Sequence, residues 1–389
     1  MSMEYYRGML IQSPRMNAFR EHLKNVVQPG DHVVEIGAGL GTYSFFAAEA
    51  GASRVTAIEG TSITAVAKTI ARENGFSDRV EFIRGWYPRV KIPDSIDVVI
   101  FEDYPSRLFD AATFNLLRHI HEELLSPGTR LVPNRAKLFA APVYSESNWR
   151  VVGGLGEGND SAYGVDWNSS RQYICNTPLR MPLNGDDLRH EPKQLADIRL
   201  DVPPDADALA GSADWLFAAD TTIHGLAYWF EFEVGDGVWL SNEPGKEPGS
   251  WGYLYLPIPE PLKIRAGERL TSSVSPEVRS DKTPGWLVWN LGCGGWSYSG
   301  HEFKSFAASL SDIVQSSPSW IPRLSDEAHI ERKILESADG TRTVDDIAAA
   351  IRPMIPKLSD DEVRSYVLQI LKGRTTGDLE TRGDAERRR

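Results

Sequence analysis

The sequence has very little cysteine and no long apolar run. Its two cysteines, Cys175 and Cys293, are too few for a disulfide framework or for a zinc site made of four cysteines. No stretch reaches the roughly 18–20 apolar residues of a membrane-spanning helix, and the N-terminal MSMEYYRGML lacks the apolar segment of a signal peptide. We therefore expect a cytoplasmic protein with no membrane partner and no bound metal.

Positively charged residues are outnumbered by acidic ones. Across 389 residues, 42 lysines and arginines stand against 54 acidic residues, which gives a formal net charge of −12. A negative surface repels phosphates, so the composition predicts no nucleic-acid partner. It suits a substrate with a cationic group, although a bulk charge of this size also serves solubility.

Composition changes divide the chain into parts. Apolar runs first alternate with helical patterns, which is typical of βαβ units and a parallel sheet. Later runs alternate with a period of two and predict antiparallel strands. A helical module follows, in which Thr343 and Asp346 predict a helix cap. The predicted parts are N-terminal helices (1–30), an α/β Rossmann-like domain (31–142), a β-rich domain (143–320), a helical module (325–373) and a disordered tail (374–389).

A glycine-rich loop is the strongest local motif. A predicted strand that contains Glu35 leads into Gly37, Gly39 and Gly41, and the next strand ends at Glu59. Glycines let the backbone approach a ligand, and an acid about twenty residues on is placed to accept hydrogen bonds from ribose hydroxyls. Both dinucleotides and S-adenosylmethionine use this arrangement, and the GxGxG spacing with Glu35 favours S-adenosylmethionine. Alternatively, Glu35 is a structural residue that accepts hydrogen bonds from backbone N–H groups.

Five segments in order resemble the protein arginine methyltransferases, over roughly residues 5–300. They include EIGAGLGTYSFFAAEAGASRVTAIEG, SPGTRLVPNRAKLFAAPV and IHGLAYWFEFEV. The resemblance implies a Rossmann-like S-adenosylmethionine-dependent methyltransferase domain, then a β-barrel domain with a dimerisation arm at about 146–185, and a homodimer. It also implies that the N-terminal helices cover the cofactor, that Arg15 binds its carboxylate and that Met9 lies beside its sulfonium.

The chemistry of a guanidinium explains the acids that the family uses. A guanidinium is always protonated and poorly nucleophilic, so carboxylates must hold it and localise its charge. Glu102 occupies the position of the first of the family's two glutamates. The second position falls on Ala111, which leaves Asp110 or Asp103 as the replacement. Asp110 as a turn or helix-cap residue is an equally open alternative.

Some of the other predicted site residues differ from the residues that the family has at the same positions. A His-Trp pair in the family is Ser250-Trp251 here, and Trp251 offers an aromatic face to a cation while Ser250 is a weaker proton acceptor. Trp86 is placed to stack on the adenine or to pack against a helix. We assign the substrate side to Ser250, Trp251, Tyr6 and Tyr104.

Three functions remain open at this stage. The first is methylation of a guanidino group on free arginine, another small molecule or a peptide, by a divergent bacterial family member in secondary metabolism. The second is methyl transfer to another nitrogen or oxygen acceptor. The third is a non-catalytic, cofactor-binding regulatory protein. The helical module resembles the winged-helix units of bacterial peptide-modifying pathways, and it recognises a leader peptide or packs against the rest of the protein.

Overall fold

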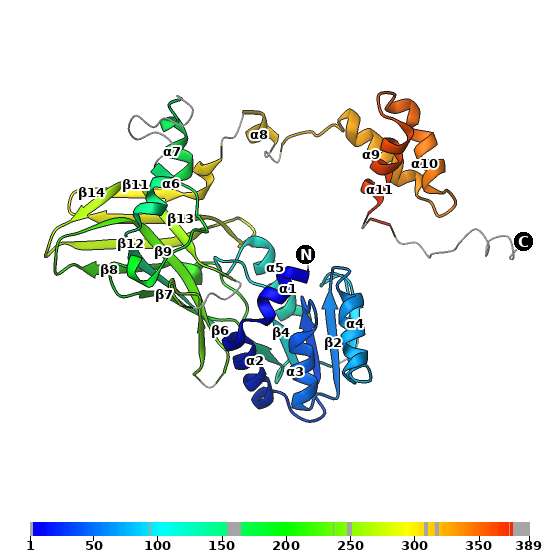
Figure 1. Ribbon diagram of the computed structural model, residues 1–389, viewed down its shortest axis with the longest axis horizontal. Helices are drawn as coiled ribbons and strands as arrows, with labels where there is room; N and C mark the ends of the chain where they lie inside the picture. Colours follow the sequence, from blue (N-terminus) through cyan, green and yellow to red (C-terminus); the bar gives the residue numbers. More distant parts are fainter. Residues whose placement is uncertain are drawn as a thin grey trace, which may run out of the picture. The chain divides into compact units, whose positions relative to one another are not determined.

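The computed structural model describes residues 3–92, 95–153, 165–235, 237–246, 251–306, 310–315, 319–372 and 374–375. Ser250 and residues 376–389 of the predicted tail lie outside these ranges. The chain forms two compact units, 1–307 and 308–389 (Figure 1). None of the helices in the described ranges has the length and apolar character needed to cross a bilayer.

A five-stranded parallel sheet forms the first part of unit 1. Its order is β3-β2-β1-β4-β5, so β1 lies between β2 and β4. Every residue of β1 and β4 is buried, which accounts for their largely apolar sequences. The carboxyl ends of these strands meet at one edge, where open α/β sheets bind ligands. The strands are β1 (His32–Ile36), β2 (Arg54–Glu59), β3 (Val80–Arg84), β4 (Val98–Phe101) and β5 (Arg130–Val132).

Helices flank this sheet. The N-terminal segment forms two helices, and the second packs against the helix that follows the glycine loop (Figure 1). Phe19 and Leu23 are fully buried and fix this packing. The N-terminus is thereby held near the carboxyl edge of the sheet. These helices are α1 (Met3–Leu10), α2 (Ser13–Val26), α3 (Thr42–Ala50), α4 (Thr64–Glu73) and α5 (Ala111–Glu123).

Two antiparallel sheets form the rest of unit 1. One has the order β10-β9-β6-β7 with β11 paired to β9, and the other has the order β14-β13-β12-β8. The first begins at Arg135, before the predicted boundary at residue 142, because β6 pairs with β7 and β9 directly after β5. The strands are β6 (Arg135–Val143), β7 (Lys193–Arg199), β8 (Gly211–Leu216), β9 (Thr221–Glu233), β10 (Trp239–Ser241), β11 (Leu254–Ile264), β12 (Arg269–Val278), β13 (Pro284–Cys293) and β14 (Trp296–His301).

The predicted arm region contains two helices, α6 (Glu146–Gly153) and α7 (Asn168–Ile174). Val152 and Cys175 pack with Trp229 and Tyr255 of the antiparallel sheet in a small apolar cluster of their own. The described ends of the arm are therefore anchored to the sheet, and residues 154–164 lie outside the described part.

Unit 2 contains a helical bundle. Its core includes Ile334, Ile347, Ile351, Val363 and Val367. The predicted helix cap is confirmed, because Thr343 and Asp346 form a capping box at the start of α10. Within residues 310–315, 319–372 and 374–375 the unit has helices and no strand, so this part lacks the β-wing of the winged-helix units it resembles. Its helices are α8 (Leu310–Gln315), α9 (Asp326–Ser337), α10 (Val344–Ile351) and α11 (Asp360–Leu371).

Candidate active site

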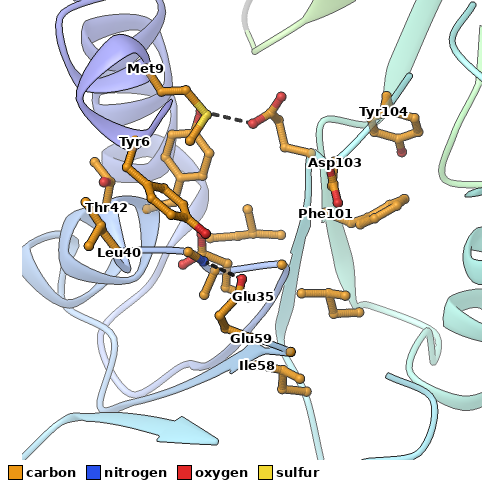
Figure 2. Close-up of a pocket in the computed structure, with 18 of the residues that line it drawn as sticks. Tyr6, Met9, Glu35, Leu40, Thr42, Ile58, Glu59, Phe101, Asp103 and Tyr104 are labelled. Atoms are coloured by element: carbon orange, nitrogen blue, oxygen red, sulfur yellow. Dashed lines mark hydrogen bonds between the residues drawn. The ribbon is translucent and has the colours of Figure 1, made fainter. Parts of the chain in front are cut away.

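A cavity of about 240 Å³ opens at the carboxyl edge of the parallel sheet (Figure 2). It brings together most of the predicted site residues. Gly41 and Asp110 are not among the residues that line it, and Ser250 lies outside the described residues. The lining includes Tyr5, Tyr6, Met9, Arg15, Glu35, Gly37, Gly39, Glu59, Trp86, Glu102, Asp103, Tyr104 and Trp251.

The glycine loop and Glu59 form one wall of the cavity. Glu59, at the end of β2, accepts hydrogen bonds from the N–H groups of Gly39 at 3.0 Å and Thr61 at 2.7 Å. A carboxylate has about four acceptor positions, so Glu59 retains capacity for ligand hydroxyls. Gly41 precedes α3 with a φ of 82°, a left-handed conformation that favours glycine. It therefore shapes the turn rather than the lining.

The first helix closes the cavity from above. Met9 of α1 lines the cavity on the side of this helix (Figure 2). Tyr6 lies on the glycine loop, where a Cβ added to Gly39 would stand 2.7 Å from its ring. Its hydroxyl is buried and has no hydrogen-bond partner within the described ranges. Tyr6 thus lies on the side of the glycine loop, although the sequence placed it with the substrate.

Glu35 is buried in the middle of β1. It accepts a hydrogen bond from the hydroxyl of Ser44 on α3. Burial raises the pKa of its carboxyl from 4.5 to about 8, against the opposing effect of the Ser44 hydrogen bond. The Glu35 side chain lines the cavity and also connects α3 to the sheet. Glu35 therefore has a structural role as well as a place in the site.

Glu102, directly after β4, lies at the centre of an electrostatic cluster. Its carboxylate forms an ion pair with Arg15 and lies 3.3 Å from the hydroxyl of Tyr43. Arg15 also donates to that hydroxyl at 3.0 Å, and its guanidinium carbon lies 4.2 Å from the ring centroid of Trp251. The cavity thus holds a guanidinium between a carboxylate and an aromatic face.

Burial also affects the electrostatics of Glu102. Desolvation raises the pKa of Glu102, and the charge of Arg15 opposes this effect without cancelling it. The second oxygen of Glu102, Oε1, is buried without a hydrogen-bond partner within the described ranges. Such an oxygen is poised to accept a donor from a ligand, because an unsatisfied buried acceptor is costly.

The two candidates for a second acid differ in position. Asp103 lines the cavity, and desolvation raises the pKa of its carboxyl, with further repulsion from Glu59 and Asp110. Asp110 instead precedes α5 and accepts a hydrogen bond from the N–H of Thr113 at 2.8 Å, as a helix cap does. It lines a separate groove. Of the Asp103 and Asp110 carboxylates, only that of Asp103 is found with Glu102 among the described residues that line the cavity.

Two aromatic residues extend the walls. Trp86 is 64% exposed, and it lies so close to Gly60 that a Cβ there would collide with the indole. Tyr104 is buried against Phe101 and Phe232, with ring centroids 4.8 and 4.9 Å away. Trp86 therefore presents an open face beside Glu59, whereas Tyr104 is mainly a packing residue.

Sequence reasoning missed several members of the site. Tyr43 bonds to both Arg15 and Glu102, and Tyr5 stands at the opening. Ser106 of the loop after β4 donates to the carbonyl of Trp251 at 2.5 Å. Tyr43 lies two residues after the last glycine of the loop, in the first turn of the helix that begins at the ligand-binding edge of the sheet. This position in the sequence could have identified it as a site residue.

Comparison with known proteins finds arginine methyltransferases among the relatives of this chain. No protein-family model matches the chain. It is 26% identical over 309 residues to protein arginine N-methyltransferase 6 of Xenopus laevis, covering 75% of this chain and 88% of that protein. It is also 26% identical over 272 residues to the histone-arginine methyltransferase CARMER of Drosophila yakuba, of which the match spans 51%. The resemblance to the protein arginine methyltransferases is confirmed by these relatives.

Solved structures give the same result for the fold. The Trypanosoma brucei PRMT1 enzyme-prozyme heterotetrameric complex with AdoHcy superposes with a TM-score of 0.67 at 21% identity, over 76% of this chain and 97% of that one. Arabidopsis thaliana protein arginine methyltransferase 10 gives a TM-score of 0.62 at 20% identity, over 76% and 96%. The predicted fold class, a Rossmann-like domain followed by a β-barrel domain, is confirmed.

Proposed function

We propose that the protein is an S-adenosylmethionine-dependent N-methyltransferase that acts on a guanidino group. One observation carries this proposal: the cavity already surrounds a guanidinium, that of Arg15, with the Glu102 carboxylate and the Trp251 ring. A site that holds one guanidinium by charge and by an aromatic face has the chemistry to hold another. The relatives described above support the same reaction class.

The residues present fit the cofactor. The glycine loop leaves no room for a side chain at Gly39, and Glu59 is fixed by two N–H groups with its remaining acceptor capacity on the cavity. Glu59 would bind the ribose hydroxyls, Arg15 the carboxylate, and Trp86 the adenine through its open face. Bound S-adenosylmethionine supplies an electrophilic methyl group on a sulfonium.

The chain's own residues would orient the acceptor. Arg15, drawn to the carboxylate of the bound cofactor, would leave Glu102 free to pair with a substrate guanidinium. Glu102 would then hold the positive charge on the far nitrogens, so that the remaining nitrogen faces the methyl group. Positioning of this kind supplies most of the rate, because bringing two reactants into line removes much of the entropic barrier.

We assign the role of second acid to Asp103 in preference to Asp110. Asp103 lines the cavity, while Asp110 is engaged with the first turn of α5. Burial and the charges of Glu59 and Asp110 raise the pKa of the Asp103 carboxyl, and a raised pKa makes its carboxylate a stronger base for the proton that the methylated guanidinium releases.

The acceptor would be free arginine, another guanidino compound or a peptide. The altered second acid and the serine at position 250 distinguish this site from one built for protein tails, and a role in bacterial secondary metabolism stays a prediction of the sequence. A different nitrogen or oxygen acceptor is the second candidate, because only one of the family's two glutamate positions is kept.

We also infer a homodimer formed through the arm. Val151 and Trp167 of this region are 62% and 39% exposed, so the arm offers apolar side chains to a second copy of the chain. Sedimentation equilibrium would show a dimer, and a monomer at micromolar concentration would contradict this inference.

Two measurements test the proposed function. Calorimetry is expected to show micromolar binding of S-adenosylmethionine that Gly39→Trp abolishes, since the indole would occupy the space of Tyr6 and the ligand. Transfer of a labelled methyl group to L-arginine or an arginine peptide, with no transfer to imidazole or hydroxyl acceptors, would support the guanidino assignment. Transfer to the latter acceptors alone would support the second candidate instead.

A further inference from the structure

The loop between β4 and α5, residues 102–110, carries two acids of the cavity but contains no helix or strand of its own. We call it the acid loop. Within it, Leu108 is fully buried and has a φ of 71°, a left-handed conformation that is uncommon and costly for a leucine. Such a conformation persists only where the surrounding structure enforces it, so contacts from outside the loop must hold it in place.

Arg107 and Glu302 form the strongest of these contacts. Arg107 donates two hydrogen bonds to the Glu302 carboxylate, from Nη1 to Oε2 at 2.8 Å and from Nη2 to Oε1 at 2.5 Å. This forked geometry is the one in which an arginine binds a carboxylate most strongly. The two side chains are only 24% and 12% exposed, so salt and water screen this pair less than they screen an exposed ion pair.

Glu302 is itself fixed to an antiparallel sheet. It directly follows β14, and its Oε2 also accepts a hydrogen bond from the N–H of Leu287 in β13 at 2.9 Å. Because β13 and β14 pair with each other, the carboxylate belongs to a rigid part of the sheet. Arg107 thus anchors the acid loop to this sheet, one residue before the strained Leu108.

Trp251 connects the acid loop to the cavity. The hydroxyl of Ser106 donates to the backbone carbonyl of Trp251 at 2.5 Å, and the indole N–H of Trp251 donates to the carbonyl of Glu102 at 3.4 Å. The Trp251 ring and the Glu102 carboxylate also contact the same guanidinium, that of Arg15. A shift of the acid loop would therefore displace the carboxylate and the aromatic face together.

We propose that Arg107 and Glu302 are positioning residues for methyl transfer, and that their ion pair holds the acid loop where Glu102 and Asp103 face the acceptor. Neither residue of the pair is among the described residues that line the cavity, so both act through the loop. A misplacement of about 1 Å at a reacting group can cost a factor of about 100 in rate. This inference rests on the proposed function and adds residues outside the cavity to it.

The test is a double-mutant cycle on the full chain. Arg107→Gln, Glu302→Gln and the double variant are compared with the native protein. The readouts are kcat for the guanidino acceptor that the native protein methylates and the Kd of S-adenosylhomocysteine. Glutamine at position 302 keeps an oxygen acceptor for the Leu287 N–H and removes the charge.

Each single variant is expected to lower kcat at least about tenfold, and the double variant no further, since either substitution breaks the same pair. The Kd of S-adenosylhomocysteine should stay close to the native value, because the glycine loop and Glu59 lie outside the acid loop. Arg107→Lys keeps the charge without the fork and should recover part of the lost kcat. Arg269→Gln breaks an exposed ion pair with Asp214 and is the matched control, which should leave both readouts unchanged.

The possible failures of the two proposals differ. A kcat for Arg107→Gln within about twofold of the native value, or losses that add in the double variant, would overturn the positioning role and leave the proposed function intact. Loss of S-adenosylhomocysteine binding together with kcat, in Arg107→Gln and Arg107→Lys alike, would assign the pair to folding alone and also overturn it. Failure of the native protein to methylate any guanidino acceptor would contradict both proposals.

Discussion

Acidic side chains in the cavity of unit 1 and at the exposed caps and turns of unit 2 have opposite electrostatic environments. In unit 1, burial raises the pKa values of Glu35 and Glu102 above those of free carboxyl groups. In unit 2, hydrogen bonds lower the pKa values of Asp339 and Glu362, whose side chains lie at exposed helix caps and turns. Acidic residues therefore have two roles in this chain. The buried acids of unit 1 are costly to ionise and are available to a ligand, whereas the exposed acids of unit 2 stabilise the local backbone.

The largest effect is expected at Glu102. Glu102→Gln keeps the shape of the side chain and removes the charge that would hold the guanidinium, so kcat should fall at least about 100-fold. Steady-state methyl transfer to arginine measures this change. Glu81→Gln, at an exposed acid of β3, is the control and should leave the rate unchanged. A rate within a few-fold of the native value would mean that the guanidinium-clamp mechanism is wrong.

The next prediction separates Asp103 from Asp110. Asp103→Asn should lower kcat about tenfold, since it removes the second carboxylate of the cavity. Asp110→Asn should keep the rate, because asparagine also caps a helix well, and Asp110→Ala should cost about 1 kcal/mol of stability. Kinetics and denaturant unfolding of all three variants would check this order. A larger loss of rate for Asp110→Asn than for Asp103→Asn would reverse the assignment.

Glu35 gives unit 1 a characteristic pH dependence. Its pKa is raised from 4.5 to about 8 in the folded protein, so between these values the folded state holds a proton that the unfolded chain releases. The stabilising contribution of Glu35 is therefore complete below about pH 4.5 and is lost as the pH rises toward 8. Relative to Glu35→Gln, the native free energy of unfolding should fall by more than about 1 kcal/mol from pH 5 to pH 8. A constant difference across this range would refute the raised pKa.

The smallest effect is expected in unit 2. Thr343→Ala removes the hydroxyl of the α10 capping box and should destabilise this unit by about 1 kcal/mol, while methyl transfer stays unchanged. Hydrogen exchange of residues 344–351 would then be faster, and Ser359→Ala should do the same for α11. A loss of methyl transfer in either variant would show that unit 2 takes part in the reaction.

The two kinds of acid also differ in how far the sequence predicts them. The cap at Thr343 depends on residues three positions apart, so local spacing was sufficient. The strand ends at Glu59 and Glu102 were likewise predictable, because the glycine loop and the alternation of strands and helices fix the edge of a parallel sheet. The choice between Asp103 and Asp110 was not predictable, since it depends on where α5 begins.

Contacts between distant segments were also beyond the sequence. The pairing of Arg15 with Glu102 joins residues that are 87 positions apart, and Arg180 meets the carbonyl of a residue 71 positions away. Trp251 was left open between core packing and cation binding, and it does both: it is 5% exposed, packs against Phe232, and faces a guanidinium. Such dual roles appear only when the sheets are assembled.

A crystal structure with S-adenosylhomocysteine and L-arginine tests the central claim most directly. The account predicts that Arg15 turns to the cofactor carboxylate and that the substrate guanidinium lies within hydrogen-bond distance of Glu102 and over the Trp251 ring. An Arg15–Glu102 ion pair that persists in this complex, with the arginine bound elsewhere, would contradict it.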